Sequence, residues 1–437
     1  MTDQASAPRL DVRYWNLEQA FPRRGANAVW PYEDRLSSKA LIWDVEQPSV
    51  TLADVQPAAD LSRLGLIEPR QHMMRLPHDG DAASAWWETE AGRQLIDLCL
   101  EAKHIRLTPA IWTKEASGIA DSLRKRGVDV MSEVKASHGR IFHWNTRVGM
   151  RDLFLADDAL ADVRVPSTIC HDGRQLRLTI DRLDESALMV KSNFALGGFG
   201  SCLVEKASQV ELSTLEDLNR SFLDSEAAKK GFDWAWRDEP FVVETVVGNL
   251  RTNRSVTVDA RCREHGVVEL VGLSEQLLAR ETHYRGIATP SAPPIVTARP
   301  RMETAVESVG AQLAARGYRG HFNLDFVVTD EGTCHLVDLN VRRSAPLDLH
   351  MVLRRISAQF PDLTCYRHVE DLPVMSATED ELRRAIDARG RGFGPSGGLV
   401  VVRGPSRDGD GPPRAAVLGV ADDPGRLEWL FEDPGFE

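Results

Sequence analysis

The most regular alternation of hydrophobic and polar positions lies between residues 317 and 344. Every second residue from Phe322 to Val328 is apolar, and alternation returns between Cys334 and Leu339. The segment between them, Asp330-Glu331-Gly332, has the residues that tight turns use. Because a period of two is typical of a strand with one buried face, this pattern predicts a β-hairpin.

The predicted hairpin carries acidic and amide side chains on otherwise apolar strands. Asn323 and Asp325 share a face of the first strand, and Asp338 and Asn340 share a face of the second. If the two faces coincide, the cluster needs a cation to neutralise it, and its oxygen ligands suit Mg²⁺. Arg342 follows the second strand, where it can meet an anionic substrate or a phosphoryl group. The alternative is a solvated hairpin edge whose polar side chains are exposed.

Other periodic segments predict a mixed α/β chain. Strands are expected at 39–45 and 104–112, and amphipathic helices at 86–102 and 115–127. A helix is predicted from Met302 to Arg316, ended by Gly317. Residues 274–294 follow neither period, and we interpret them as a loop region. A smaller unit of two strands and a short helix is expected after residue 394.

A second candidate for phosphate chemistry is a lysine followed by a glycine-rich loop. The apolar strand 187–190 leads into Lys191, and Gly197, Gly198 and Gly200 precede a second strand at 201–205. Glycines let the backbone approach a ligand closely, and a lysine supplies positive charge at phosphates. Ordinary hairpins also contain glycine. The interpretation as a phosphate-binding loop therefore depends chiefly on the lysine and on the acidic hairpin downstream.

Composition narrows the class of protein. With 437 residues, the chain is too long for one ordinary core and predicts two or three domains or subdomains. A net charge of −12 argues against general nucleic-acid binding. The six cysteines form no C-x-x-C pair, so neither a zinc site nor a disulfide framework is indicated. Since no signal pattern or membrane-length apolar run is present, we expect a cytoplasmic protein.

The hairpin motif resembles the metal-binding hairpin of the ATP-grasp superfamily. The match is the pattern D-(x)12-D-x-N-x-R beginning at Asp325, which follows an R-G-x-x-N-x-D strand. The family commonly has Glu where this chain has Asp338. The C-terminal extension and the SEQ, YRG and GYRGHFN segments are similar to those of carboxylate–amine (peptide) ligases of natural-product biosynthesis, of the pheganomycin type.

The resemblance implies a fold class and a division of the chain. The fold is α/β (α+β): an ATP-grasp fold with an N-terminal α/β pre-ATP-grasp domain and a small C-terminal extension. The expected units are 1–140 (N-terminal arm and pre-ATP-grasp domain), 141–360 (nucleotide-binding and catalytic region) and 361–437 (C-terminal extension).

The resemblance also assigns roles to residues. Arg147, in the place of a family lysine, Lys191 and the three glycines would contact the nucleotide phosphates. Glu244 and the nearby backbone, including Val247, would meet the adenine base. Arg251 lies where the family commonly has an acid for the ribose. Arg342, with Arg280 and Arg285, would act on the carboxylate and acyl phosphate, while Asp325, Asp338 and Asn340 would bind metal.

The implied activity is ATP-dependent formation of an amide or peptide bond through an acyl phosphate. The implied cofactors are ATP and two Mg²⁺ ions, with Mn²⁺ as a substitute. The partners are a small-molecule carboxylate and an amine, without nucleic acid or membrane, and a homodimer is left open. The alternatives are a phosphotransferase on the same fold, an inactive ATP-binding sensor, and a structural protein in which these residues are incidental.

Overall fold

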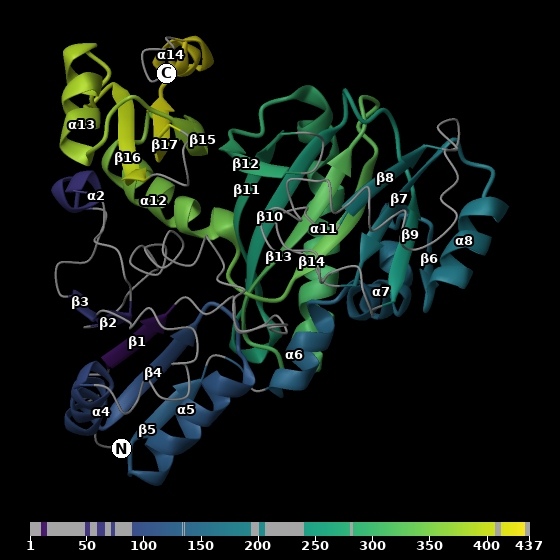
Figure 1. Cartoon of the computed structure of the whole chain (residues 1–437), viewed down its shortest axis with the longest axis horizontal. Coiled ribbons are helices and arrows are strands. Elements are labelled where there is room, and N and C mark those ends of the chain that lie inside the picture. Colours follow the sequence, from purple (N-terminus) through teal and green to yellow (C-terminus); the bar gives the residue numbers. More distant parts are fainter. Residues whose placement is uncertain are drawn as a thin grey trace.

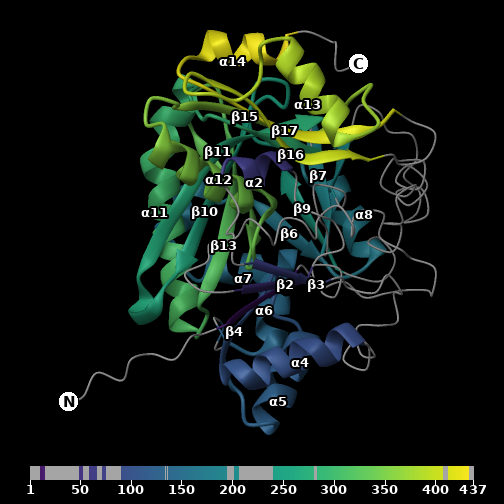
Figure 2. The same ribbon diagram turned by 90° about the vertical axis from the view of Figure 1, so that its left-hand side faces the viewer.

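The computed structural model describes residues 10–14, 49–52, 59–65, 71–74, 90–132, 134, 136–193, 201–205, 240–279, 283–406 and 412–432. Three sheets with flanking helices are formed by these residues (Figure 1). Figure 2 shows the same arrangement from the side. The predicted strand at 39–45 and the glycine loop lie outside the described residues.

The N-terminal sheet is parallel and five-stranded, with the order β3-β2-β1-β4-β5. Its strands are β1 (Leu10–Tyr14), β2 (Ser49–Leu52), β3 (Gln71–Met74), β4 (His104–Pro109) and β5 (Asp129–Ser132). The helices of this part that fall within the described residues are α2 (Ala59–Arg63), α4 (Glu90–Ala102) and α5 (Lys114–Lys125). Helices α4 and α5 and strand β4 confirm the elements predicted there.

A four-stranded antiparallel sheet, in the order β6-β9-β7-β8, forms the second part. Its strands are β6 (Ser167–Cys170), β7 (Ala187–Ser192), β8 (Ser201–Glu205) and β9 (Phe241–Thr245). The associated helices are α6 (His138–Trp144), α7 (Arg147–Leu155), the 3₁₀ helix η4 (Asp158–Val163) and α8 (Gly173–Arg182). The predicted strands on either side of the glycine loop are therefore confirmed.

The largest sheet has eight strands in the order β14-β13-β10-β11-β12-β15-β17-β16. Its strands are β10 (Arg254–Cys262), β11 (Val268–Ala279), β12 (His283–Ala288), β13 (Gly320–Val328), β14 (Cys334–Asn340), β15 (Cys365–Pro373), β16 (Gly397–Ser406) and β17 (Arg414–Ala421). Its helices are η7 (Glu264–Gly266), α11 (Pro293–Ala315), α12 (Ala345–Gln359), α13 (Glu379–Ala388) and α14 (Pro424–Phe431). Strands β13 and β14 confirm the predicted hairpin.

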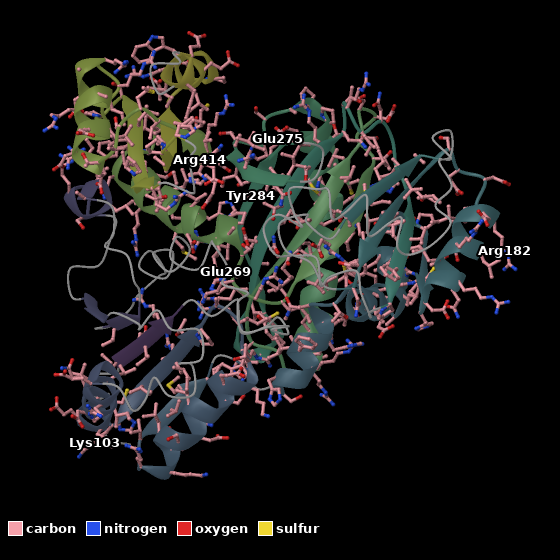
Figure 3. The ribbon with its side chains drawn as sticks, viewed as in Figure 1. Lys103, Arg182, Glu269, Glu275, Tyr284 and Arg414 are labelled. Atoms are coloured by element: carbon pink, nitrogen blue, oxygen red, sulfur yellow. The ribbon has the colours of Figure 1, made fainter. Side chains whose placement is uncertain are left out.

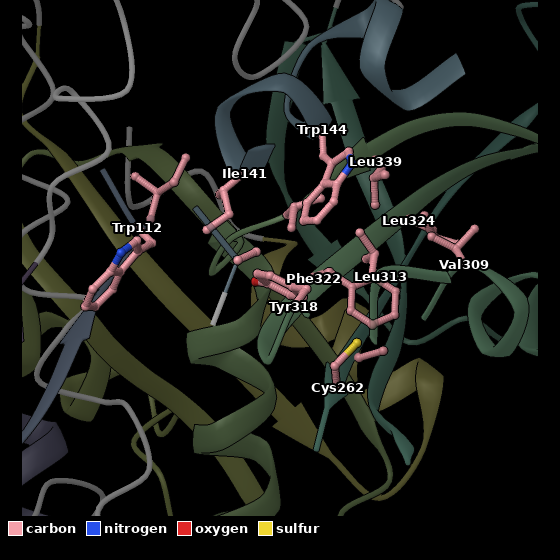
Figure 4. Packing of buried hydrophobic residues seen from close by; sticks show 14 of the residues in the cluster. Trp112, Ile141, Trp144, Cys262, Val309, Leu313, Tyr318, Phe322, Leu324 and Leu339 are labelled. Atoms are coloured by element: carbon pink, nitrogen blue, oxygen red, sulfur yellow. The ribbon is translucent and has the colours of Figure 1, made fainter. Parts of the chain in front are cut away.

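Among the described residues, two apolar clusters pack the large sheet against its helices and against the N-terminal sheet. In the first, the apolar residues of β10 and β13 pack with the buried side of α11, as Figure 4 shows for Phe322, Leu324 and Leu313. The second lies around β16, β17 and α12 and includes Val271 of β11. Because alternate residues of β13 enter the first cluster, the polar residues between them are directed to the opposite face of the sheet.

Two predictions about elements are wrong. Helix α11 begins at Pro293, nine residues before the expected Met302. Proline is tolerated in the first turn, where its missing N–H is not needed, and Pro300 is accommodated inside the helix. Residues 274–279 and 283–288, interpreted as loop, form the end of β11 and strand β12, which pair with each other across a register shift. The irregular pairing hides the period of two.

No helix in the described part of the chain is long and apolar enough to cross a membrane.

Candidate active site

Polar side chains of β10, β13 and β14 form two rows that cross one face of the large sheet, each row running from strand to strand. Antiparallel register places Asp325 opposite both Thr257 and Asp338, and it places Asn323 opposite both Asp259 and Asn340. The predicted convergence of Asn323, Asp325, Asp338 and Asn340 is thus present in the structure. Since the other face of β13 lies in the apolar core, this cluster occupies the face away from α11.

Asp325 is the most heavily hydrogen-bonded acid of the cluster. Its Oδ1 accepts from Gln276 Nε2 at 2.9 Å and from Asn323 Nδ2 at 3.2 Å, and its Oδ2 accepts from Asn340 Nδ2 at 3.5 Å. Burial, together with the nearby Asp259, raises the pKa of Asp325 to about 6, although a hydrogen bond with Thr257 and the charges of Arg147 and Arg342 act in the opposite direction. The carboxylate form is therefore costly here unless a cation balances it.

The donor set fits a hard cation. Two carboxylates, Asp325 and Asp338, and the amide of Asn340 supply oxygen ligands. The buried Oδ1 of Asn323 has no hydrogen-bond partner. No group of three or more His, Cys, Asp or Glu side chains is placed to hold a metal among the residues that the structure describes. Mg²⁺ commonly takes only one or two carboxylates and completes its shell with water and phosphate oxygens, so this set is sufficient.

Arg147 joins helix α7 to the hairpin. Thr146 caps the helix, and the backbone N–H of Arg147 donates to Asn193 O at 3.0 Å. The buried guanidinium donates through Nη1 to Asp338 Oδ1. Burial lowers the pKa of Arg147, while Glu244 and Asp325 act in the opposite direction. The arginine therefore supplies positive charge beside a predicted metal ligand.

Lys191 brings a second cation to the same hairpin. It lies on β7, and its Nζ is 2.7 Å from Glu244 Oε2 on β9. The same Nζ donates to Val337 O of β14 at 3.1 Å. Burial lowers the pKa of Lys191, and the charge of Glu244 raises it. Lys191 thus connects the four-stranded sheet to β14, one residue from Asp338.

Arg342 is held at the end of the hairpin by a residue that the sequence reasoning did not single out. Its Nη1 donates to Asn145 Oδ1 at 2.6 Å. Asn145 Oδ1 also accepts from Val341 N at 3.0 Å, and its Nδ2 donates to Val341 O at 3.2 Å. Burial, then Arg147, lowers the pKa of Arg342 to about 10, so it remains charged at neutral pH. The only sequence signal for Asn145 was its position directly before Thr146, the cap of α7.

The remaining predicted residues have other surroundings. Arg285 lies on β12 with its Nη1 3.7 Å from Asp371 Oδ2, and its side chain is 42% exposed. Val247 follows β9, and its carbonyl oxygen accepts from Asn253 Nδ2 at 2.6 Å. Gly197, Gly198, Gly200 and Arg280 lie outside the described residues. The structure brings together Arg147, Lys191, Glu244, Asp325, Asp338, Asn340 and Arg342.

A series of buried polar contacts next to the acidic cluster was also not predicted from the sequence. His350 Nδ1 lies 3.1 Å from Asp259 Oδ2, and its Nε2 lies 2.6 Å from Ser274 Oγ. Ser274 Oγ is in turn 2.8 Å from Tyr366 OH. Ser344, the cap of α12, donates to Asp259 Oδ1. Ser274 is fully buried, and these contacts link α12 to β10, β11 and β15.

Comparison with known proteins adds information at the level of structure. No protein-family model matches the sequence, and no curated protein matches it. A biotin carboxylase–β,γ-ATP complex from Campylobacter jejuni has a TM-score of 0.56 and 12% identity, covering 96% of this chain and 89% of that one. An N5-carboxyaminoimidazole synthase from Aspergillus clavatus, in complex with ADP and 5-aminoimidazole ribonucleotide, has a TM-score of 0.56 and 13% identity, covering 98% and 97%. The corresponding synthetase from Staphylococcus aureus, complexed with ADP, has a TM-score of 0.53 and 12% identity, covering 98% and 97%.

These structures share one architecture with the chain over nearly its whole length. The chain has the ATP-grasp fold. The fold class predicted from the hairpin motif is therefore confirmed. In this ATP-grasp chain, cations from α7 and β7 converge on β14 from the side of the smaller sheet.

Proposed function

We propose that this protein is an ATP-dependent carboxylate–amine ligase. The observation that carries the proposal is the convergence of Arg147, Lys191 and Arg342 on a hairpin whose oxygen ligands suit Mg²⁺. Support comes from structures of the same fold that contain ADP or an ATP analogue. In its more specific form, the proposal is that the protein forms an amide or peptide bond on an amino-acid-like substrate in natural-product biosynthesis.

The proposed reaction has two steps. A carboxylate oxygen of the substrate attacks the γ-phosphorus of ATP, the bond from that phosphorus to the β,γ-bridging oxygen breaks, and ADP leaves. The amine nitrogen then attacks the acyl carbon, the bond to the phosphate oxygen breaks, and inorganic phosphate leaves as the amine loses a proton to solvent. Catalysis of this kind depends chiefly on positioning and on neutralising charge.

Positioning and charge neutralisation would be carried out by different residues of this chain. Asp325, Asp338 and Asn340 would hold Mg²⁺, which supplies positive charge at the phosphate oxygens. Lys191, held by Glu244, would lie at the same phosphates. Arg147, whose Nη1 donates to Asp338, would add positive charge at the phosphates beside the metal. Arg342, kept in position by Asn145, would stabilise the acyl phosphate.

Other predicted contacts complete the proposal. Glu244 and Val247 stay the candidates for the adenine side of the nucleotide. Gly197, Gly198 and Gly200 would cover the phosphates, and Arg280 and Arg285 would contact the acceptor substrate. ATP with two Mg²⁺ ions is the proposed cofactor set.

The decisive experiment is ADP release by the purified protein with ATP and Mg²⁺, challenged with pooled carboxylic acids and amines, with products identified by mass spectrometry. The proposal predicts ADP that depends on an acid and an amine, together with an amide of the summed mass less water. ADP with a stable phosphorylated product would identify a phosphotransferase instead. Tight ATP binding without turnover on any acid would favour a sensor.

A further inference from the structure

Gln276 of β11 reaches across a neighbouring strand to a proposed metal ligand. In the large sheet, β10 lies between β11 and β13, yet Gln276 Nε2 donates to Asp325 Oδ1 at 2.9 Å. Ser255 of β10 donates through its Oγ to Gln276 Oε1 at 2.8 Å. Both ends of the Gln276 amide therefore have a partner, and its N–H is held against one oxygen of Asp325.

The two oxygens of Asp325 have different surroundings. Oδ1 accepts from Gln276 and, at 3.2 Å, from Asn323 Nδ2, whose shorter hydrogen bond of 2.7 Å goes to Thr257 Oγ1. Of these amides, only Asn340 donates to Oδ2, at 3.5 Å. The Thr257 hydroxyl also bonds the carboxylate, but a hydroxyl can rotate, whereas an amide that is fixed at both ends cannot. Oδ2 is therefore the oxygen that Asp325 has available for a metal ion.

Asp338, the second proposed carboxylate ligand, is arranged in a similar way. Its Oδ1 accepts from Arg147 Nη1 and from the backbone N–H of Leu339, the latter at 2.8 Å. Within the part of the chain that the structure describes, no hydrogen bond reaches Asp338 Oδ2. Each of the two carboxylates thus has one oxygen engaged by protein donors and one left for a cation.

The number of oxygens that a carboxylate offers discriminates between cations. Mg²⁺ demands a near-octahedral shell, whereas Ca²⁺ accepts more oxygens and can take both of them from one carboxylate. A carboxylate that is held to a single oxygen therefore disfavours Ca²⁺ more than Mg²⁺. The removal of a hydrogen bond that orients such a ligand changes metal affinity by about 10- to 100-fold.

We propose that Gln276 is a positioning residue for Asp325. Its amide keeps Oδ1 engaged, so that Asp325 binds metal through Oδ2 alone and the site selects Mg²⁺ or Mn²⁺ over Ca²⁺. Ser255 holds the Gln276 amide in the required orientation. The inference rests on the proposed function and deepens it, because it names a residue that determines which metal the site takes.

The first test measures metal binding without turnover. Mn²⁺ is titrated into protein saturated with a non-hydrolysable ATP analogue and followed by electron paramagnetic resonance, with Mg²⁺ and Ca²⁺ as competitors. Gln276→Met keeps the length of the side chain and has no N–H, so the Kd for Mn²⁺ is expected to rise about 10-fold or more. Competition by Ca²⁺ relative to Mg²⁺ should strengthen by about 10-fold, because Oδ1 becomes available to the larger ion.

Further variants separate this role from packing. Gln276→Asn keeps the amide but is one methylene shorter, so it should not span β10 and should behave like Gln276→Met. Ser255→Ala removes only the hydrogen bond to Gln276 Oε1 and is expected to shift selectivity in the same direction by a smaller factor. Glu275→Gln is the control: this residue, labelled in Figure 3, is the neighbour on the opposite face of β11, paired with Arg254, and its replacement should leave metal binding unchanged. A cooperative thermal transition checks that each variant is folded.

The outcomes distinguish the two proposals. Wild-type selectivity in folded Gln276→Met and Ser255→Ala overturns the inference and leaves the ligase proposal standing, as does an equal loss of affinity for all three metals. A shift towards Ca²⁺ in a protein that releases no ADP with any acid supports the inference, and then only the ligase proposal fails. If the wild-type complex with the ATP analogue binds no Mn²⁺, both proposals fail.

Discussion

At the scale of single residues, the hairpin keeps its acids next to buried cations from other elements. Asp338 is paired with Arg147, and Glu244 is paired with Lys191 next to the same strand. Asp325 accepts hydrogen bonds from the amides of Gln276 and Asn323, and burial raises its pKa to about 6 although the charges of Arg147 and Arg342 act in the opposite direction. The positive charge that would balance the cluster is therefore missing chiefly at Asp325, and a metal ion would supply it there.

Replacement of either proposed carboxylate ligand, Asp325 or Asp338, should abolish turnover and leave the fold intact. Asp325→Asn and Asp338→Asn are expected to lower acid-dependent ADP release by roughly 100-fold or more, because the charge of the transferred phosphoryl group is then poorly balanced. Asp330→Asn, an exposed position in the turn of the same hairpin, is the matched control and should keep wild-type turnover. Normal rates in the first two variants, measured at saturating Mg²⁺, would refute the metal assignment.

The Lys191–Glu244 pair should behave as a unit in stability. Both side chains are more than 90% buried, so Lys191→Met leaves an unpaired carboxylate and is expected to cost about 3–5 kcal/mol in the free energy of unfolding. Glu244→Gln should be costly for the same reason. The double variant is expected to lose less than the sum of the two, as coupled neighbours do. Urea unfolding of all four proteins gives the coupling; additive losses would mean that the two side chains do not interact.

A pH effect follows from His321. Burial, with the charge of Arg343 next and Arg261 after it, lowers the pKa of His321 well below its ordinary value. The folded protein then resists protonation that the unfolded chain accepts, so this residue contributes stability above about pH 6.5 that is lost as the pH falls. His321→Asn should reduce the loss of unfolding free energy between pH 7.5 and 5.5. His265→Asn, which removes an exposed histidine, is the control, and an equal acid loss in wild type and His321→Asn would contradict the argument.

At the scale of elements, close packing of α12 on β11 decides how the segment after Arg342 is held. His350 of α12 lies over Gly272, where a Cβ would be only 2.5 Å from the imidazole Cγ. The absence of a side chain at position 272 thus makes room for the chain of buried polar contacts from Asp259 to Tyr366. Four elements, β10, β11, α12 and β15, meet in that chain.

Gly272→Ala should therefore destabilise the protein. Insertion of a methyl group against a buried ring is expected to cost about 1–3 kcal/mol. Gly118→Ala in α5, where a Cβ would meet nothing within 4 Å, should instead be neutral or stabilise by about 0.5–1 kcal/mol. Chemical denaturation of the two variants measures the contrast. If Gly272→Ala is as stable as Gly118→Ala, the ring does not occupy the place that the structure assigns to it.

The hairpin was predictable because its information is local. Alternation between Phe322 and Val328 fixes which side chains of β13 share a face, so Asn323 and Asp325 are placed together by the local sequence. That Asp338 and Asn340 lie on the same face depends on the register of β13 with β14, which shifts between Asp325 and Phe326. The partners of these residues come from distant elements. Arg147 is 191 positions from Asp338, and Asn145 is 197 positions from Arg342, so their contacts depend on how separate elements pack. The start of α11 and strand β12 were missed because prolines and a register shift obscure the local period.

At the scale of the whole molecule, the C-terminal strands extend the sheet that carries the site. Strand β15 pairs with β12 and with β17, so β15, β17 and β16 complete the eight-stranded sheet. Figure 3 marks Tyr284 on β12 and Arg414 on β17, on either side of this junction. Helix α2, from the N-terminal part, also packs here, and its Asp60 Oδ2 accepts from Val401 N at 3.1 Å. Helix α2 of the N-terminal part and the C-terminal strands thus lie side by side on one part of the sheet.

Removal of residues 361–437 should consequently prevent formation of a stable fold. The truncation uncovers the edge of β12 and exposes buried apolar residues of the second cluster, including Val352 and Ile356 of α12. Exposed strand edges and apolar surface favour aggregation, so we expect an insoluble or non-cooperatively unfolding product without ATP affinity. Removal of residues 433–437 alone, which lie beyond α14, is the control and should keep the melting temperature and ATP binding. A soluble 1–360 fragment that unfolds cooperatively and binds ATP would instead show that the C-terminal strands are an independent addition to the ATP-grasp fold.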